Sequence, residues 1–169
     1  ARGTIYHRVL ECIDLEQEIT KESLKNQISV MVKSRKLTAR DAGTVKVRQL
    51  LQFAASPIGR RMQAAARRGV LKREQPFVVG VPASEVGDGW PDEEMILVQG
   101  IIDAYFEENG KLVLVDYKTD RAASADGREI AQKYSRQLQL YAKALEQISG
   151  KKIGERIIYS LSLGREILV

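Results

Sequence analysis

An Asn109-Gly110 dipeptide between two strand-like segments constrains the fold of this 169-residue chain more than any other feature. Asn-Gly is the strongest short-range signal for a two-residue type I′ turn, because both central positions of that turn need a positive φ. The turn fixes the register of the whole hairpin. In that register Asp103 lies directly opposite Asp116. Lys118 projects from the same face, since it follows Asp116 by two positions.

The alternate positions of this hairpin predict a continuous apolar face, made of Ile102, Ala104, Phe106, Val113, Val115 and Tyr117. On the other face, two carboxylates with Cβ atoms about 5 Å apart repel each other and destabilise a sheet. A shared proton, a basic neighbour or a divalent cation would offset the repulsion, and oxygen ligands suit Mg²⁺ or Mn²⁺. The alternative is a surface hairpin with solvated charges and a Lys118–Asp103 ion pair. The flanking apolar runs indicate burial instead, and a buried acidic pair needs a reason.

The segment before the hairpin predicts helices. Apolar residues recur at helical spacing over residues 4–13, 21–34, 38–54 and 56–68. Thr4 and Thr38 are the expected N-caps of the first and third of these helices. Ser56-Pro57 has the form of an N-cap followed by Pro at the first helical position, which opens the fourth.

From residue 71 onward the pattern changes to strands. Strand-like segments cover residues 76–81, 95–106 and 111–117, and residues 84–94 read as a loop. A long helix over residues 127–148 and a final strand or hairpin over 157–163 and 167–169 follow. The chain is therefore expected to be one mixed α/β domain over residues 1–169, with residues 1–70 as a helical part and residues 71–169 as a sheet-bearing core.

Composition excludes several classes of protein. The single cysteine, Cys12, rules out an internal disulfide framework and a four-Cys iron–sulfur cluster, and favours a reducing cytoplasm. No apolar run is long enough for a transmembrane helix, and no P-loop motif for ATP is present. The first residues carry neither an initiator Met nor a signal-peptide pattern, which indicates a piece of a longer chain.

The net charge of +5 favours a polyanionic partner only weakly. The basic side chains are unevenly distributed, and one short stretch holds Arg60, Arg61, Arg67, Arg68, Lys72 and Arg73. Such a cluster is either a solvated helix end or a track for backbone phosphates, and the sequence leaves both interpretations open. No zinc-finger spacing or basic zipper accompanies it, so no base-reading motif is predicted.

An ordered series of motifs resembles the RecB-family nuclease domain of the PD-(D/E)xK superfamily. The series is Gly3-Thr4-x-x-His7, Arg73-Glu74-x-Pro-Phe77, Gly100-Ile-Ile-Asp103, Val115-Asp116-Tyr-Lys118-Thr-Asp120 and Gln137-Leu-Gln-Leu-Tyr141. The chain length and the lack of a cysteine cluster look most like the C-terminal nuclease domain of AddA-type helicase–nucleases. The resemblance implies a restriction-endonuclease-like core, with a small mixed sheet and a flanking long helix.

The resemblance also implies a metal site and a catalytic lysine. Asp103 and Asp116 would hold Mg²⁺ or Mn²⁺, and His7 would complete the ligand set. Lys118 would position or help deprotonate the attacking water and stabilise charge on the phosphate. Without the motif series, His7 would be a helix-face histidine with a structural hydrogen bond. Glu74 is either solvated or bonded to a metal-bound water, and both interpretations are open.

The long helix carries two further catalytic candidates, Gln137 and Tyr141, on one face with Tyr134 and Leu138. Leu138 and Tyr134 are expected in the core. The Gln137 amide needs a polar partner, which is either a DNA phosphate or Lys118, and the Tyr141 hydroxyl is expected at the same place. The candidates for contacts with DNA phosphates are Arg60, Arg61, Arg67 and Arg68.

The resemblance implies a metal-dependent deoxyribonuclease of exonuclease type, which acts mainly on single strands in double-strand-break repair and recombination. The implied partners are helicase domains N-terminal in the same chain and a second, AddB-like subunit, with no iron–sulfur cluster, ATP site or membrane. The alternative is a catalytically silent DNA-binding or docking module of the same fold. The intact His7, Asp103, Asp116 and Lys118 argue against it. An RNA-processing nuclease is a third interpretation that the sequence leaves open.

Overall fold

A mixed sheet organises the chain, whose computed structural model describes residues 2–91 and 93–169. In the described residues the sheet has five strands in the order β1-β2-β3-β4-β5. The strands are β1 (Leu71–Pro82), β2 (Met95–Glu108), β3 (Lys111–Lys118), β4 (Ile153–Ser160) and β5 (Arg165–Leu168). β3 and β4 run parallel and are joined through the long helix α7 (Arg128–Ser149), whereas the other neighbours are antiparallel. The predicted mixed α/β class is confirmed.

The turn between β2 and β3 has the predicted geometry. Asn109 and Gly110 have φ values of 52° and 76°, as a type I′ turn needs. The pairing runs from the turn to Ala104 opposite Val115, which confirms the register expected from the sequence. Asp103 and Asp116 are the residues directly beyond this last pair.

The sheet has apolar cores on both sides, and β2 contributes to both of them. Most of the predicted apolar face packs with the N-terminal helices, namely Ala104, Phe106, Val113, Val115 and Tyr117. Ile102 differs from the prediction, because it packs with Phe77 and Leu114 in a second cluster under α7. β2 is 14 residues long, and a strand of that length twists, so its two halves do not turn the same face to the same layer.

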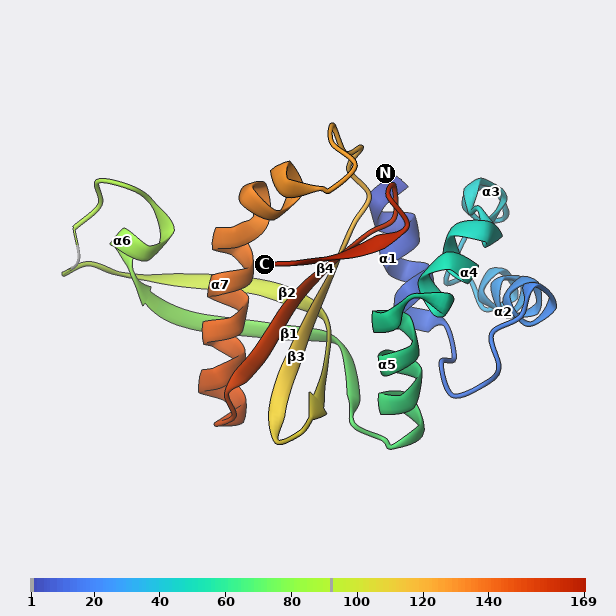
Figure 1. Ribbon diagram of the computed structural model, residues 1–169, viewed down its shortest axis with the longest axis horizontal. Coiled ribbons are helices and arrows are strands. Elements are labelled where there is room, and N and C mark those ends of the chain that lie inside the picture. The colour runs from blue at the N-terminus through green and yellow to red at the C-terminus, as the bar shows by residue number, and fades with distance from the viewer. Residues whose placement is uncertain (1, 92) are drawn as a thin grey trace.

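The N-terminal helices gather on the side of the sheet away from α7 (Figure 1). They are α1 (Arg2–Cys12), α2 (Lys21–Lys33), α3 (Ala39–Thr44), α4 (Val47–Ala55) and α5 (Pro57–Arg67). Ser56 caps α5 by accepting from the Gly59 amide at 3.0 Å, as its position before Pro57 predicts. The Thr4 cap is wrong, because α1 already begins at Arg2. The predicted third helix is two helices, since Val45 has an extended backbone.

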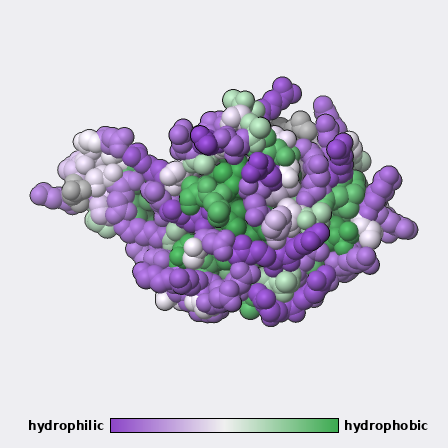
Figure 2. Space-filling model, viewed as in Figure 1, coloured by the Kyte–Doolittle hydropathy of each residue, from purple (hydrophilic) through white to green (hydrophobic). Residues whose placement is uncertain are grey.

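β1 and β2 extend past α7 as a two-stranded ribbon, with the short helix α6 (Ala83–Val86) near its tip (Figure 1). This helix begins the segment predicted as a loop over residues 84–94, of which Asp92 lies outside the described residues. Figure 2 shows a mostly hydrophilic face with hydrophobic side chains gathered near its middle, where the C-terminal end lies. Among the described residues, no helix has both the length and the apolar character needed to cross a membrane.

Candidate active site

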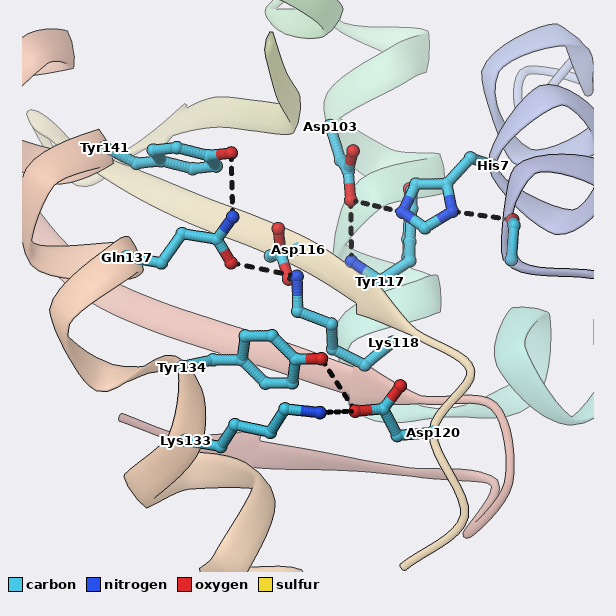
Figure 3. A network of polar contacts seen from close by, with 11 residues as sticks. His7, Asp103, Asp116, Tyr117, Lys118, Asp120, Lys133, Tyr134, Gln137 and Tyr141 are labelled. Atoms are coloured by element: carbon cyan, nitrogen blue, oxygen red, sulfur yellow. Dashed lines mark hydrogen bonds and ion pairs between the residues drawn. The ribbon is translucent and has the colours of Figure 1, made fainter. Parts of the chain in front are cut away.

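Side chains from α1, β2, β3 and α7 converge at the end of the β2–β3 hairpin that is remote from its turn (Figure 3). At the centre are Asp103 and Asp116, which are only 8% and 3% exposed. The Tyr117 amide donates to Asp103 Oδ2 at 2.8 Å, so this carboxylate replaces a backbone carbonyl as the acceptor at the point where the strands separate. The register predicted from the turn thus brings the two carboxylates to one site.

His7 on α1 lies against the first of these carboxylates. Its Nε2 is 3.1 Å from Asp103 Oδ2, and its Nδ1 donates to the Gly3 carbonyl at 2.8 Å. The hydrogen bond with Asp103 raises the pKa of His7 to about 9, although burial opposes this shift. At neutral pH the imidazole is therefore a cation beside the carboxylate pair.

Lys118 lies against the second carboxylate, with its Nζ 2.6 Å from Asp116 Oδ2. Burial raises the pKa of Asp116 to about 6, and the negative charge of Asp103 adds to this shift, while Lys118 opposes it. The two carboxylates thus repel each other inside the protein, as the sequence predicts, and a cation stands beside each of them.

A chain of hydrogen bonds connects Lys118 with α7. Lys118 Nζ donates to Gln137 Oε1 at 3.0 Å, and Gln137 Nε2 donates to the Tyr141 hydroxyl at 3.0 Å. The sequence left two possible partners for the Gln137 amide, a DNA phosphate and Lys118, and in this structure the partner is Lys118. The Tyr141 ring also contacts Phe77 edge-on, with 5.2 Å between the ring centres. Both candidates on the long helix therefore reach the site.

Sequence reasoning missed a second link between Lys118 and α7. Lys118 Nζ lies 4.1 Å from the centre of the Tyr134 ring, and the Tyr134 hydroxyl donates to Asp120 Oδ2 at 2.6 Å. Lys133 pairs with the same Asp120 oxygen at 2.7 Å. Tyr134, expected in the core, does pack against the cluster of Ile130, Leu138, Ile158 and Ile167, but it is half-buried and its ring also covers the lysine. The sequence did hold one signal for this link, because Asp120 lies two residues after Lys118 in the same motif and is therefore close enough to hold a side chain of α7 beside the lysine.

Glu74 on β1 has a left-handed backbone with φ of 51°, which is rare outside glycine. Burial raises the pKa of its carboxyl group, and the negative charge of Asp103 adds to the shift. Within residues 2–91 and 93–169 no hydrogen bond holds this carboxylate. The backbone conformation at Glu74 is of the strained kind that clusters at functional sites.

Arg61, predicted to contact DNA, forms ion pairs within the protein instead. Its guanidinium lies 2.6 Å from Glu108 Oε2 and 2.9 Å from Glu155 Oε1, and its side chain is 25% exposed. Glu108 adjoins the hairpin turn, so this network lies at the end of the hairpin away from Asp103. Arg61 stabilises the packing of α5 against the hairpin.

The other predicted DNA contacts also lie on α5 or directly after it, and the structure does not bring them to the site. Arg68 donates to the Glu107 carbonyl and Arg67 to the Glu16 carbonyl, both at 3.3 Å. Arg60 is exposed. A track for DNA along these arginines would therefore run past the turn end of the hairpin rather than past the carboxylates.

The predicted metal ligands are close together but are paired with other groups. In the part of the chain that the structure describes, no three His, Cys, Asp or Glu side chains form a ready-made metal cluster. His7 contacts Asp103, and Asp116 contacts Lys118. The donor set nevertheless fits a divalent cation. The charge of Asp103 raises the pKa of the buried Asp116, so a positive charge between the two carboxylates would be favourable, and their oxygens are hard ligands.

Comparison with known proteins agrees with this chemistry. The family model described as the PD-(D/E)XK nuclease superfamily matches residues 1–165. Proteins named as one subunit of an ATP-dependent helicase/nuclease are similar to 94% of the chain, at 41% identity in Alkaliphilus metalliredigens and at 39% in Alkaliphilus oremlandii. The protein of the same name in Lachnoclostridium phytofermentans is 32% identical over 99% of the chain. The chain spans 13–15% of the length of these relatives.

Proposed function

Because the chain belongs to the PD-(D/E)XK nuclease superfamily, we propose that it hydrolyses DNA phosphodiester bonds with the help of a divalent metal ion. One observation carries the proposal. The buried carboxylates of Asp103 and Asp116 repel each other at one end of the hairpin, and the Lys118 ammonium lies 2.6 Å from one of them. Buried acids of this kind lower the stability of a protein when nothing is bound to them. They are typical of sites that bind a ligand or carry out a reaction.

The proposed roles follow from the chemistry of each group. Asp103 and Asp116 would hold Mg²⁺, with Mn²⁺ as a substitute, and His7 would complete the ligand set. When bound, the ion lowers the pKa of a water molecule and draws charge from a phosphate oxygen. Lys118, steadied by Gln137 and through it by Tyr141, presents its ammonium to the negative charge that develops on the phosphate.

His7 and Glu74 fit supporting roles. The imidazolium pairs with Asp103 before metal binding, and it must lose a proton to become a ligand. Glu74, whose carboxylate has no hydrogen bond in the described residues, suits an interaction with a metal-bound water.

We further propose that residues 1–169 are a single nuclease domain of a longer helicase–nuclease, with residues 1–70 as its helical part and residues 71–169 as its catalytic core. In this proposal helicase domains precede the segment in the same chain, and a second AddB-like subunit pairs with it. The activity would be that of a cytoplasmic exonuclease on single-stranded DNA during double-strand-break repair and recombination. The names of the relatives support the link to a helicase.

The test is cleavage of end-labelled single-stranded DNA by the chain, both alone and within the full-length polypeptide, with Mg²⁺ and with a chelator. We expect cleavage only with the metal, its loss in Asp116→Asn, and its retention in Asp126→Asn, which removes an exposed carboxylate. A folded, DNA-binding protein without cleavage in either form would support the silent module. Cleavage of RNA in preference to DNA would support an RNA-processing enzyme.

A further inference from the structure

A cavity of about 270 Å³ lies next to the candidate active site. Its lining includes Tyr6, Lys46, Gln49, Thr119, Arg121 and Ser162. Thr119 connects the cavity with the site, because its hydroxyl lies against Gly3, whose carbonyl accepts from His7 Nδ1 at 2.8 Å. A ligand that occupies the cavity would therefore be a neighbour of a group bound at the carboxylates.

The charge of the cavity is positive. Lys46 and Arg121 are exposed, and neither forms an ion pair within residues 2–91 and 93–169. No lining residue is acidic. The cavity between α7 and β4 differs, because Lys143 and Arg156 share its lining with Glu146 and Glu155. The cavity beside the active site is thus suited to an anion.

Hydrogen bonds around the buried Tyr6 hold the wall of the cavity in place. The Tyr6 hydroxyl donates to Gln49 Oε1 at 2.5 Å and accepts from the Lys46 amide at 3.0 Å. Gln49 Nε2 in turn donates to the Leu161 carbonyl at 2.9 Å. Tyr6 is 1% exposed, so this network links α1, the start of α4 and the end of β4 from inside the protein. Lys46 is therefore presented from a fixed backbone.

Thr119 adds a donor beside the two cations. Its hydroxyl forms no hydrogen bond in the described part of the chain, whereas the Ser162 hydroxyl donates to the Asp120 carbonyl at 2.5 Å. A backbone phosphate is recognised by cationic side chains together with hydroxyl donors, and such contacts position a strand without reading its sequence. The cavity offers this set of groups.

We propose that this cavity binds a backbone phosphate of the DNA strand, next along the strand from the phosphodiester held at Asp103 and Asp116. Lys46 and Arg121 supply its charge contacts and Thr119 supplies a hydroxyl donor. The strand thus follows the α1 side of the site, and the arginines of α5 lie off its path. The inference rests on the proposed nuclease function and identifies where that site holds its substrate.

The test measures binding of single-stranded DNA across a salt series, in the Asp116→Asn background that prevents hydrolysis. Lys46→Ala/Arg121→Ala should bind about tenfold more weakly, with a log–log salt slope shallower by roughly 1.4 for two lost contacts. The matched control is Lys25→Ala/Lys72→Ala, which removes the same charge from two lysines outside the cavity and should change the affinity less than twofold. A single Arg121→Lys variant, which keeps the positive charge, should retain most of the affinity of the Asp116→Asn protein. Equal affinity of the cavity variant and the control variant overturns the proposal.

Two further readouts separate this inference from the proposed function. With Asp116 intact, the cavity variant should raise KM for DNA while its cleavage of bis(p-nitrophenyl) phosphate, which is too small to span both places, stays unchanged. If the unmodified protein cleaves neither compound but only the cavity variant loses DNA binding, the nuclease function fails and the phosphate site stands. If the double variant does not fold, Arg121→Glu alone, at an exposed position after β3, must weaken DNA binding or the proposal fails.

Discussion

The Lys118 ammonium lies 4.1 Å from the centre of the Tyr134 ring, so an aromatic face covers the lysine of the candidate active site. Asp116 and Gln137 contact the same ammonium at 2.6 Å and 3.0 Å. The lysine is therefore held from three directions, by one charge, one amide and one ring. A cation held in this way is preorganised for charge that develops on a bound phosphate.

Lys118→Ala should lower kcat for DNA cleavage by on the order of 10²–10³, the usual effect of removing one charge-stabilising group. Metal affinity should change much less, because Lys118 contacts Asp116, the proposed metal ligand, and is not itself a proposed ligand. Steady-state cleavage and calorimetric titration with Mg²⁺ measure the two effects. Lys143→Ala, at a lysine elsewhere on α7, is the control. A variant that binds metal poorly but cleaves normally at saturation would contradict this role.

Asp120→Ala should lower kcat by about threefold to tenfold, since it removes the acceptor of the Tyr134 hydroxyl and loosens the ring over Lys118. Tyr134→Phe should have a similar or smaller effect, because it keeps the ring, and Tyr134→Leu should have a larger one. KM for DNA should stay within about twofold in all three. Equal losses in Tyr134→Phe and Tyr134→Leu would show that the ring itself does not matter.

Asp116→Asn should stabilise the metal-free protein while it abolishes cleavage. Burial raises the pKa of Asp116 to about 6 in the folded state, from 3.8 for the unperturbed group, so the folded state binds the proton more tightly than the unfolded state. Stability therefore falls as the pH rises from about 3.8 to about 6, and the full loss is present above that range. In a chelator at pH 8, urea denaturation should show the variant to be more stable than the unmodified protein, by on the order of 2 kcal/mol of unfolding free energy.

The stability difference between Asp116→Asn and the unmodified protein should shrink as the pH falls from 8 to 5. Below the folded-state pKa of about 6 the Asp116 carboxyl group of the unmodified protein is protonated and, like Asn, carries no charge. Asp126→Asn, which replaces an exposed carboxylate, should not gain stability over the unmodified protein at pH 8 in this way. Saturating Mg²⁺ should reverse the order of stability, since only the unmodified protein has both carboxylates to bind it. An advantage that does not vary with pH would mean that repulsion between the carboxylates is not its source.

Arg61→Ala should lower the free energy of unfolding by on the order of 1–2 kcal/mol, because it leaves Glu108 and Glu155 without their shared cation. DNA affinity of the folded variant should not change, in contrast to the phosphate contact considered for this residue from the sequence. Arg60→Ala, one position earlier and exposed, should affect neither property. Urea denaturation and DNA titration provide the two measurements.

Local signals in the sequence predicted the parts of the site that depend on short-range geometry. The Asn109-Gly110 turn fixes which residues of β2 and β3 face each other, and this alone brings Asp103 to Asp116. The helical spacing of Gln137 and Tyr141 likewise fixes that both lie on one face of α7. Such relationships follow from backbone geometry within a single element or hairpin.

The rest of the site depends on how distant elements pack, which short-range patterns do not encode. Tyr134 reads as a core residue by periodicity, and only the approach of α7 to the end of β3 brings it over Lys118. Arg61 reads as a surface cation, and only the packing of α5 against the turn and β4 gives it two carboxylates. The split between α3 and α4 at Val45 was missed because the apolar spacing continues across it.

The β2–β3 pairing has a consequence for how this hairpin can fail. The same alignment that packs Val113 and Val115 against the N-terminal helices also brings Asp103 to Asp116, so a slip by one residue would turn these valines towards α7 and separate the acids at once. Misaligned molecules would lose their core together with their chemistry. The turn at Asn109 and Gly110 therefore ties the packing of both cores to the position of the two carboxylates.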